Sequence, residues 1–208
     1  MNALDISKKN RKAKYLLFLN VLNPSEKDKI LDVGFSNIEY SEVDNYLEKN
    51  YPFQKNITAL GIEESDLFKS HYPEVNAIRY GGEKFPFADK SFNIGWSNAV
   101  IEHVGDEERQ VLFLKELRRT CQTVYFTTPN RWFPFELHTR LPFLHWLPKQ
   151  IFDAILRFTP KKWATGDYMH LLSEYNLKKL LKKAGIVHYR IYRNKFMGFT
   201  IDFSTIFL

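Results

Sequence analysis

Cysteine is almost absent from this chain: Cys121 is the single cysteine among 208 residues. A lone cysteine excludes an internal disulfide framework and any zinc cluster built from cysteines. Cys121 stands where a strand is expected to begin, so we interpret it as a buried thiol without a chemical role.

Long hydrophobic runs are missing as well. The apolar stretch that ends at Leu22 is too short and too interrupted to cross a membrane, and no small-residue cleavage site follows it. Glycine and proline number nine each, which argues against a chain made of linkers. Hydrophobic residues (44%) and charged residues (26%) occur at ordinary globular frequencies. We therefore expect a cytoplasmic globular protein, and we expect no metal site.

Aromatic residues are abundant, at 16%, and charge is unevenly distributed. From position 131 onward the chain has 13 Lys and Arg against 5 Asp and Glu, whereas positions 1–130 have 17 against 19. Three of the four tryptophans, Trp132, Trp146 and Trp163, lie in the basic part. This combination is typical of a region that meets an anionic or amphiphilic partner. A solvated lysine-rich helix face over residues 178–183 would explain part of the charge equally well.

Short apolar strands alternate with helical patterns along most of the chain. Strands are expected at 29–34, 56–62, 75–80, 91–97, 123–128, 186–193 and 196–207. Helices are expected at 8–22, 40–49, 64–71, 106–119, 149–158 and 173–185. This alternation predicts an α/β fold: a Rossmann-like, doubly wound, mostly parallel seven-stranded sheet with an antiparallel C-terminal strand pair. Residues 1–27 form an N-terminal helical segment, and residues 28–208 form the main domain.

An aromatic-rich insertion at about residues 129–170 interrupts this rhythm. Its expected helix, 149–158, carries an apolar stripe of Ile151, Phe152, Ile155 and Leu156. The stripe is compatible with a lid over an apolar substrate or with a helix that lies on a membrane surface. A helix that packs on its own sheet would show the same pattern, and this is the commoner case.

Polar residues and glycines follow the first strands of the expected sheet, at the edge where such sheets bind ligands. Asp32 and Gly34 end the first strand, and Gly34 permits a sharp turn with close backbone approach to a ligand. The further glycines of a dinucleotide site are missing, which weighs against NAD or FAD. Glu63 ends the second strand, where a carboxylate can accept two hydrogen bonds from a ribose diol. The segments 82–83 and 96–98 flank the next two strand ends, where an adenine ring could lie.

Several segments, taken in order, resemble the successive motifs of the class I S-adenosylmethionine-dependent methyltransferases. They are Ile30–Gly34, Glu83–Phe92 and Asn98–Val104, followed by residues 170–173 and 177–185, which are similar to the C-terminal helix signature of that family. The resemblance implies an enzyme with S-adenosylmethionine as its cofactor. Residues 127–139 further resemble small bacterial members that are often placed in surface-glycan or lipid pathways, which implies a small, lipid-linked or glycan-linked methyl acceptor.

The resemblance also implies residue roles. Asp32 and the turn after it would hold the methionine part of the cofactor, Glu63 the ribose hydroxyls, and Gly82 with Glu83 the adenine edge. Residues 98–103 would border the sulfonium and the acceptor. The full set of cofactor-binding candidates is Asp32, Gly34, Phe35, Ser36, Glu63, Gly82, Glu83, Ser97 and Asn98.

The chain departs from the family pattern in its glycine-rich turn. Members of the family usually follow the first glycine with Cys-Gly-x-Gly, and this chain has Phe35-Ser36-Asn37-Ile38 there. Gly81 stands where an acidic residue is frequent, and Asn93 replaces a frequent aspartate. These departures keep a second hypothesis open, in which the chain is a non-catalytic binding or scaffold protein with a pocket blocked by Phe35 or Trp96.

Methyl transfer from an activated sulfonium depends mainly on positioning, and a general base is needed only if the acceptor is a hydroxyl. The candidates for that base are His103, His138 and His170, because histidine accepts a proton near neutral pH. A structural hydrogen bond at a helix end or in a loop is the commoner role for each of them. A nucleic acid is not the expected partner, because the clearest basic cluster lies on one helix and has no interleaved stacking motif. Contact with a membrane surface is the partner prediction that the aromatic insertion leaves open.

Overall fold

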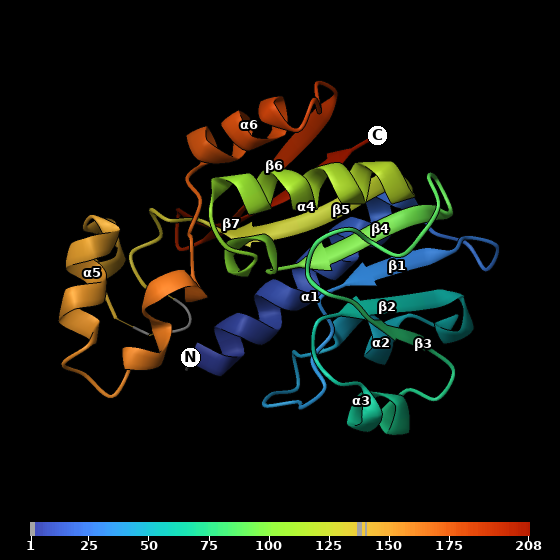
Figure 1. The fold of residues 1–208 in the computed structure, drawn as a ribbon, viewed down its shortest axis with the longest axis horizontal. Coiled ribbons are helices and arrows are strands. Elements are labelled where there is room, and N and C mark those ends of the chain that lie inside the picture. Colours follow the sequence, from blue (N-terminus) through green and yellow to red (C-terminus); the bar gives the residue numbers. More distant parts are fainter. Residues whose placement is uncertain (1–2, 137–138, 140) are drawn as a thin grey trace. The chain divides into compact units, whose positions relative to one another are not determined.

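Seven strands form a single mixed sheet in the computed structural model, which describes residues 3–136, 139 and 141–208 (Figure 1). The strand order is β3-β2-β1-β4-β5-β7-β6. The strands are β1 (Ile30–Val33), β2 (Ile57–Gly61), β3 (Asn76–Arg79), β4 (Phe92–Asn98), β5 (Cys121–Pro129), β6 (Tyr189–Phe196) and β7 (Phe199–Phe207). The order of the strands along the chain reverses between β1 and β4, which lie side by side in the sheet. The two C-terminal strands form the antiparallel pair. The predicted fold class is therefore confirmed.

The central strands are parallel and buried, as their near-continuous apolar sequences require. In the register of β1, Ile30 lies beside Ile57 of β2 and beside Ile94 of β4. β2 continues in parallel with β3, where Gly61 lies beside Arg79. The carboxyl ends of β1, β2 and β4 therefore meet at one edge of the sheet.

Six helices longer than a single 3₁₀ turn accompany these strands in the described part of the chain. They are α1 (Ala3–Leu22), α2 (Tyr46–Asn50), α3 (Asp66–His71), α4 (Glu107–Thr120), α5 (Lys149–Leu156) and α6 (Glu174–Lys183). The residues predicted to begin or end α4 and α6 are confirmed. The Asp106 carboxylate accepts the backbone N–H of Arg109 at 3.0 Å, and the Ser173 hydroxyl accepts that of Asn176 at 3.2 Å. Gly185 ends the last helix with a φ of 73°.

The helix predicted at residues 40–49 is wrong over most of its length. The Asp44 carboxylate accepts the backbone N–H groups of both Tyr40 and Ser41, at 2.8 Å each, and closes a turn there. Asn45 then adopts a left-handed conformation with a φ of 46°, which no helix interior tolerates. Only α2, which follows Asn45, is helical.

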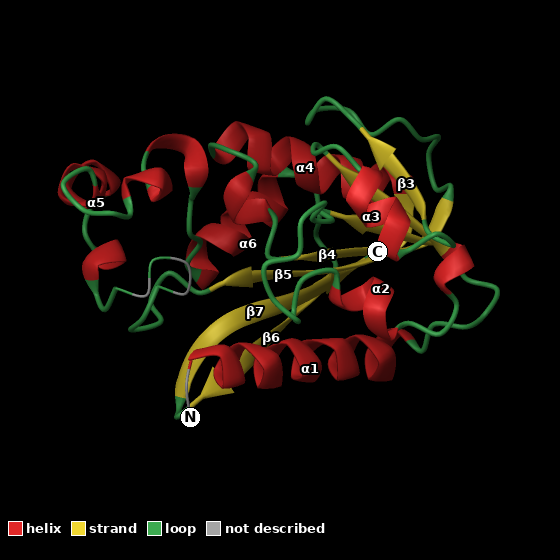
Figure 2. Cartoon of the chain, turned by 90° about the horizontal axis from the view of Figure 1, so that it is seen from below, coloured by secondary structure: helices red, strands yellow, loops and turns green. Residues whose placement is uncertain are grey.

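The chain divides into two compact units. The first consists of Met1–Asn98, Glu116–Phe126 and Ile206–Leu208, and the second of Ala99–Lys115 and Thr127–Thr205. In the first unit, α1 packs against one face of the sheet (Figure 2). Its buried Phe18 meets the rings of Trp96 at 4.8 Å and Tyr125 at 5.5 Å, and the last two rings stack at 5.1 Å. Cys121 is buried and free, as predicted.

The second unit holds the insertion, which has a small apolar core of its own. Phe152 and Leu156 of α5 are buried with Ala164 and Met169, and three partly buried leucines surround them. The Lys149–Asp153 ion pair, at 3.1 Å, supports the first turn of α5. In the described part of the chain, no helix combines the length and apolarity needed to cross a membrane.

Candidate active site

The parallel register brings the predicted cofactor residues of the first unit to one edge of the sheet. Asp32 lies between Ala59 and Trp96 in the neighbouring strands. Gly34 follows with a φ of 109°, and its N–H donates to the carbonyl of Leu60 at 2.8 Å. A side chain would strain this left-handed turn, so glycine is required at position 34.

Asp32 shares a buried environment with a second carboxyl group, that of Glu48 on α2. Asp32 is 5% exposed and Glu48 is fully buried, and the two side chains lie within hydrogen-bonding reach. Apart from Asp32 and the backbone of Glu48 itself, the Glu48 carboxyl has no hydrogen-bond partner among the described residues. Burial raises the pKa of Asp32 well above its usual range, the nearby Glu48 raises it further, and Arg11 opposes the shift. Burial likewise raises the pKa of Glu48. Sequence reasoning missed Glu48, because nothing local separates it from a surface glutamate.

The turn after β1 is held in place by its own side chains. The amide of Asn45 donates to the Ser36 carbonyl and accepts the Ser36 N–H, both at 2.8 Å. The backbone N–H of Asn37 donates to Glu63 Oε2 at 3.0 Å. The predicted ribose-binding carboxylate is therefore already bonded to the turn that precedes it.

Phe35 is a core residue. Its ring packs against that of Phe68 at 4.5 Å, and a Cβ atom at Gly61 would come within 2.7 Å of it. β2 thus ends in glycine to make room for the ring. Trp96, the other side chain expected to block a pocket, is buried against α1 as described above. Both rings serve the packing of the first unit.

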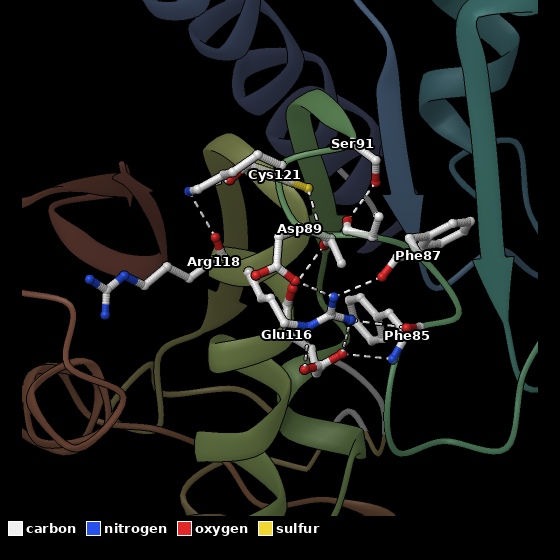
Figure 3. Close-up of polar contacts among 11 residues, drawn as sticks. Phe85, Phe87, Asp89, Ser91, Glu116, Arg118 and Cys121 are labelled. Carbon is white, nitrogen blue, oxygen red and sulfur yellow. Dashed lines mark hydrogen bonds and ion pairs between the residues drawn. The ribbon is translucent and has the colours of Figure 1, made fainter.

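Gly82 and Glu83 lie at the start of a loop that an arginine clamps. Arg119 donates to the carbonyls of Phe85 (3.0 Å) and Phe87 (2.7 Å), and it pairs with Glu116 at 2.6 Å (Figure 3). Glu116 in turn accepts the Phe85 N–H at 2.8 Å. The guanidinium lowers the pKa of the Glu116 carboxyl, although burial opposes the shift. Sequence reasoning missed this clamp, which fixes the loop that the adenine edge would touch.

The two candidates at the end of β4 differ in their contacts. Ser97 is buried, and its hydroxyl donates to the Val33 carbonyl at 3.0 Å, so it ties β4 to β1. Asn98 is the last residue of β4 and is half-buried. Ala99 follows with a left-handed φ of 58°, which turns the chain sharply away from the strand.

Two of the three candidate histidines lie in the second unit, around a buried glutamate. The Glu102 carbonyl accepts the backbone N–H of His170 at 2.7 Å, and Thr128 Oγ1 donates to Glu102 Oε2 at 3.0 Å. His103 Nδ1 is hydrogen-bonded to the Tyr168 carbonyl at 2.7 Å. His138 lies outside the described residues. Glu102 is fully buried, and its Oε1 has no hydrogen-bond partner in the described part of the chain. It is thus a further candidate for a proton acceptor, which sequence reasoning missed although it stands beside His103.

A cavity of about 310 Å³ opens within the second unit. His145, which is buried, and His170 contribute to its wall. Its lining is mixed polar and apolar, with more basic than acidic side chains: Glu107, Gln110, Arg131, His145, Leu147, Lys149, Phe152, Met169, His170, Leu171, Leu172, Asn176, Lys179 and Leu180. Such a lining can bind a hydroxylated or anionic molecule with an apolar part. Among the described residues, no three or more His, Cys, Asp or Glu side chains gather in a way that could hold a metal ion.

Comparison with known proteins finds a family match over part of the chain. The family described as a methyltransferase domain matches residues 31–123. This stretch is slightly less than half of the 208 residues, and the fold is that of S-adenosylmethionine-dependent methyltransferases. S-adenosylmethionine is the cofactor that the domain match and the fold imply.

Solved structures share the fold of this chain at low sequence identity. An S-adenosylmethionine-dependent methyltransferase from Methanosarcina mazei is 18% identical, with a TM-score of 0.60 over 90% of this chain and 95% of that one. The PH0226 protein of Pyrococcus horikoshii is 15% identical, with a TM-score of 0.64 over 96% and 89% of the two chains. A methyltransferase from Aquifex aeolicus is 16% identical, with a TM-score of 0.52 over 97% of both. A search of curated proteins found no match.

Side chains at the carboxyl edge of the sheet fit the charged part of this cofactor. The methionine end of S-adenosylmethionine carries an ammonium group, and the Asp32–Glu48 pair offers two buried carboxyl groups, of which that of Glu48 has unused acceptor capacity. A cation near the pair would relieve the cost of burying negative charge. Glu63, just after the end of β2, supplies the carboxylate for a ribose diol, although the Asn37 N–H shares it.

Proposed function

We propose that the chain catalyses methyl transfer from S-adenosylmethionine to a small, lipid-linked or glycan-linked acceptor. The observation that carries the proposal is the pairing of Asp32 with Glu48 at the carboxyl edge of the sheet, where Glu63 follows the neighbouring strand β2. The pair suits an ammonium group, and Glu63 suits vicinal hydroxyls. A ligand with both features matches the cofactor of the family.

The bound cofactor would supply an activated methyl group on a sulfonium, and the protein would supply position. Holding an acceptor in line with a transferable group can contribute roughly 7–11 kcal/mol to the barrier reduction. A hydroxyl acceptor also needs a proton acceptor, for which Glu102, His103 and His170 are the described candidates. The basic, mixed lining of the cavity in the second unit supports an acceptor that carries hydroxyl or acidic groups.

Isothermal titration calorimetry with S-adenosylmethionine and its demethylated product tests the first step. We expect both to bind, and Glu63→Gln to weaken binding by roughly tenfold to a hundredfold, because a charge-assisted hydrogen bond contributes about 1.5–3 kcal/mol. Glu64→Gln is the matched control, since Glu64 pairs with Arg79 at the exposed surface. No heat at millimolar ligand, or equal affinity in both variants, would contradict the proposal.

Transfer itself is measured with a methyl-labelled cofactor. Incubation with small-molecule and lipid fractions is expected to move label into an acceptor with the wild-type protein. A fraction labelled equally well without the protein would not support the activity.

A second candidate function, a non-catalytic binding or scaffold protein, is favoured by two specific observations. The Asn37 N–H already occupies Glu63 Oε2, and the Phe35 ring fills the space beside Gly61. In this case side chains and backbone of the turn after β1 occupy the place that a ribose would take. The same titration separates the two functions, because the second predicts no binding of either nucleoside.

A further inference from the structure

Exposed apolar side chains gather in the insertion. Among the described residues, ten of the 21 large hydrophobic side chains that are exposed lie between positions 132 and 168. This stretch holds three of the four tryptophans of the chain, and all three are exposed; the fourth is buried in the first unit. We call these ten side chains the aromatic surface: Trp132, Phe135, Phe143, Trp146, Leu147, Ile151, Ile155, Phe158, Trp163 and Tyr168.

α5 is apolar on two sides, which a helix packed only on its own core does not require. Phe152 and Leu156 face the small core of the insertion. Ile151 and Ile155, four positions apart, are 49% and 40% exposed, and Phe158 beyond the helix end is 92% exposed. The stripe expected from the sequence is therefore split: one pair of side chains stabilises the insertion, and the other pair meets solvent. An exposed row of this kind marks an interaction site.

The segments that carry the aromatic surface are neighbours around α5. The short turns Leu144–Trp146 and Lys162–Ala164 both pack against the helix, and each carries an exposed tryptophan. The Trp146 ring contacts those of Phe143 at 4.9 Å and Trp132 at 6.1 Å. The exposed apolar side chains of this face therefore come from segments that lie close together.

Basic side chains border this face. Arg157 and Lys162 are exposed beside Phe158 and Trp163 in the sequence, and no carboxylate pairs with either in the described part of the chain. Arg131 lies with its guanidinium carbon 5.7 Å from the Trp132 ring centre, and its hydrogen bond goes to the Leu147 carbonyl at 3.1 Å.

We propose that the aromatic surface docks on an anionic lipid bilayer. Tryptophan and phenylalanine beside arginine and lysine are the side chains that enter the boundary between headgroups and acyl chains. Each basic residue near an anionic leaflet adds attraction. A second copy of the chain is disfavoured as the occupant, because a twofold interface would set these cations against one another.

Vesicle flotation of the full chain tests the proposal. We expect the protein to float with vesicles made of two parts phosphatidylcholine and one part anionic phosphatidylglycerol, and to float much less with phosphatidylcholine alone. Phe158→Ser is expected to lower partitioning roughly tenfold or more, because a fully exposed phenyl ring loses its burial in lipid. Arg157→Gln is expected to lower it about fivefold on the anionic vesicles.

Matched variants outside the insertion separate lipid contact from general effects. Phe199→Ser removes a phenyl ring that is 57% exposed, and Lys182→Gln removes an exposed cation of α6; both are expected to float as the wild type does. Thermal unfolding of every variant confirms that it is folded. Absence of flotation on both vesicles, or equal losses in the controls, would overturn the proposal. Sedimentation that shows a dimer, dissociated by Phe158→Ser, would instead assign the face to a second copy and would also overturn it.

Discussion

At the scale of single residues, the carboxyl pair of Asp32 and Glu48 is the least expected feature of this protein. Two acids buried together are costly unless they share a proton or meet a cation. The sequence marks Asp32 through its place near the end of an apolar strand. The role of Glu48 becomes visible only when α2 places it beside Asp32, because nothing in its local sequence separates it from a surface glutamate.

The pair makes stability depend on pH in a defined direction. The pKa of both groups is raised in the folded state. Their protonated forms therefore stabilise the fold fully below the ordinary pKa values, 3.8 and 4.5, and this stabilisation is lost as the pH rises through the raised pKa values. Glu48→Gln removes one of the two titrating groups and keeps the shape. We expect it to raise the free energy of unfolding at pH 8 by roughly 1–3 kcal/mol and to flatten its decline above pH 5.

Urea unfolding at several pH values measures this effect. Glu42→Gln, at an exposed site, serves as the control and is expected to leave the slope with pH unchanged. An unchanged slope in Glu48→Gln would show that the pair does not titrate as described.

At the scale of elements, the loop after β3 depends on α4. Sequence motifs placed Gly82 and Glu83 near the site, but they did not show what holds the loop. Arg119, at the end of α4, makes hydrogen bonds to two loop carbonyls and to Glu116. The position of this loop, which is the candidate adenine edge, is thus set by a side chain that follows Phe85 by 34 positions in the chain.

Loss of the Arg119 clamp should be costly. Arg119→Met leaves two carbonyls without their side-chain donor and Glu116 without its ion pair, and we expect a loss of about 2–4 kcal/mol in the free energy of unfolding at pH 7. The guanidinium lowers the pKa of Glu116, so the ion pair stabilises the fold above the ordinary glutamate pKa and loses this effect as the pH falls. The difference in the free energy of unfolding between the wild type and Arg119→Met should therefore shrink in acid. Lys115→Met, on the exposed side of the same helix, is the control. Equal chemical denaturation midpoints for the two variants would contradict the role of the clamp.

At the scale of the whole molecule, the chain consists of a unit that carries most of the candidate cofactor residues and a unit that carries the candidate bases, the cavity and the aromatic surface. A ligand that binds the folded chain must stabilise it by mass action. At a concentration of one hundred times its Kd, S-adenosylmethionine is expected to raise the free energy of unfolding by about 2.7 kcal/mol.

Thermal and urea unfolding with increasing cofactor measure this linkage. Glu63→Gln should need a higher cofactor concentration for the same gain, whereas Glu64→Gln should behave as the wild type does. A stability that stays constant at every cofactor concentration would contradict binding to the folded state.

The sequence by itself determined the fold class and the order of the elements. Buried parallel strands must be continuously apolar, and helix ends need residues such as Asp106, Ser173 and Gly185, so both leave local signals. Only the tertiary structure decided which side chains cooperate. It shortened the expected helix at 40–49, paired Asp32 with Glu48, used Phe35 for packing and exposed half of the apolar stripe of α5. These outcomes depend on contacts between residues far apart in the chain, and no local pattern encodes such contacts.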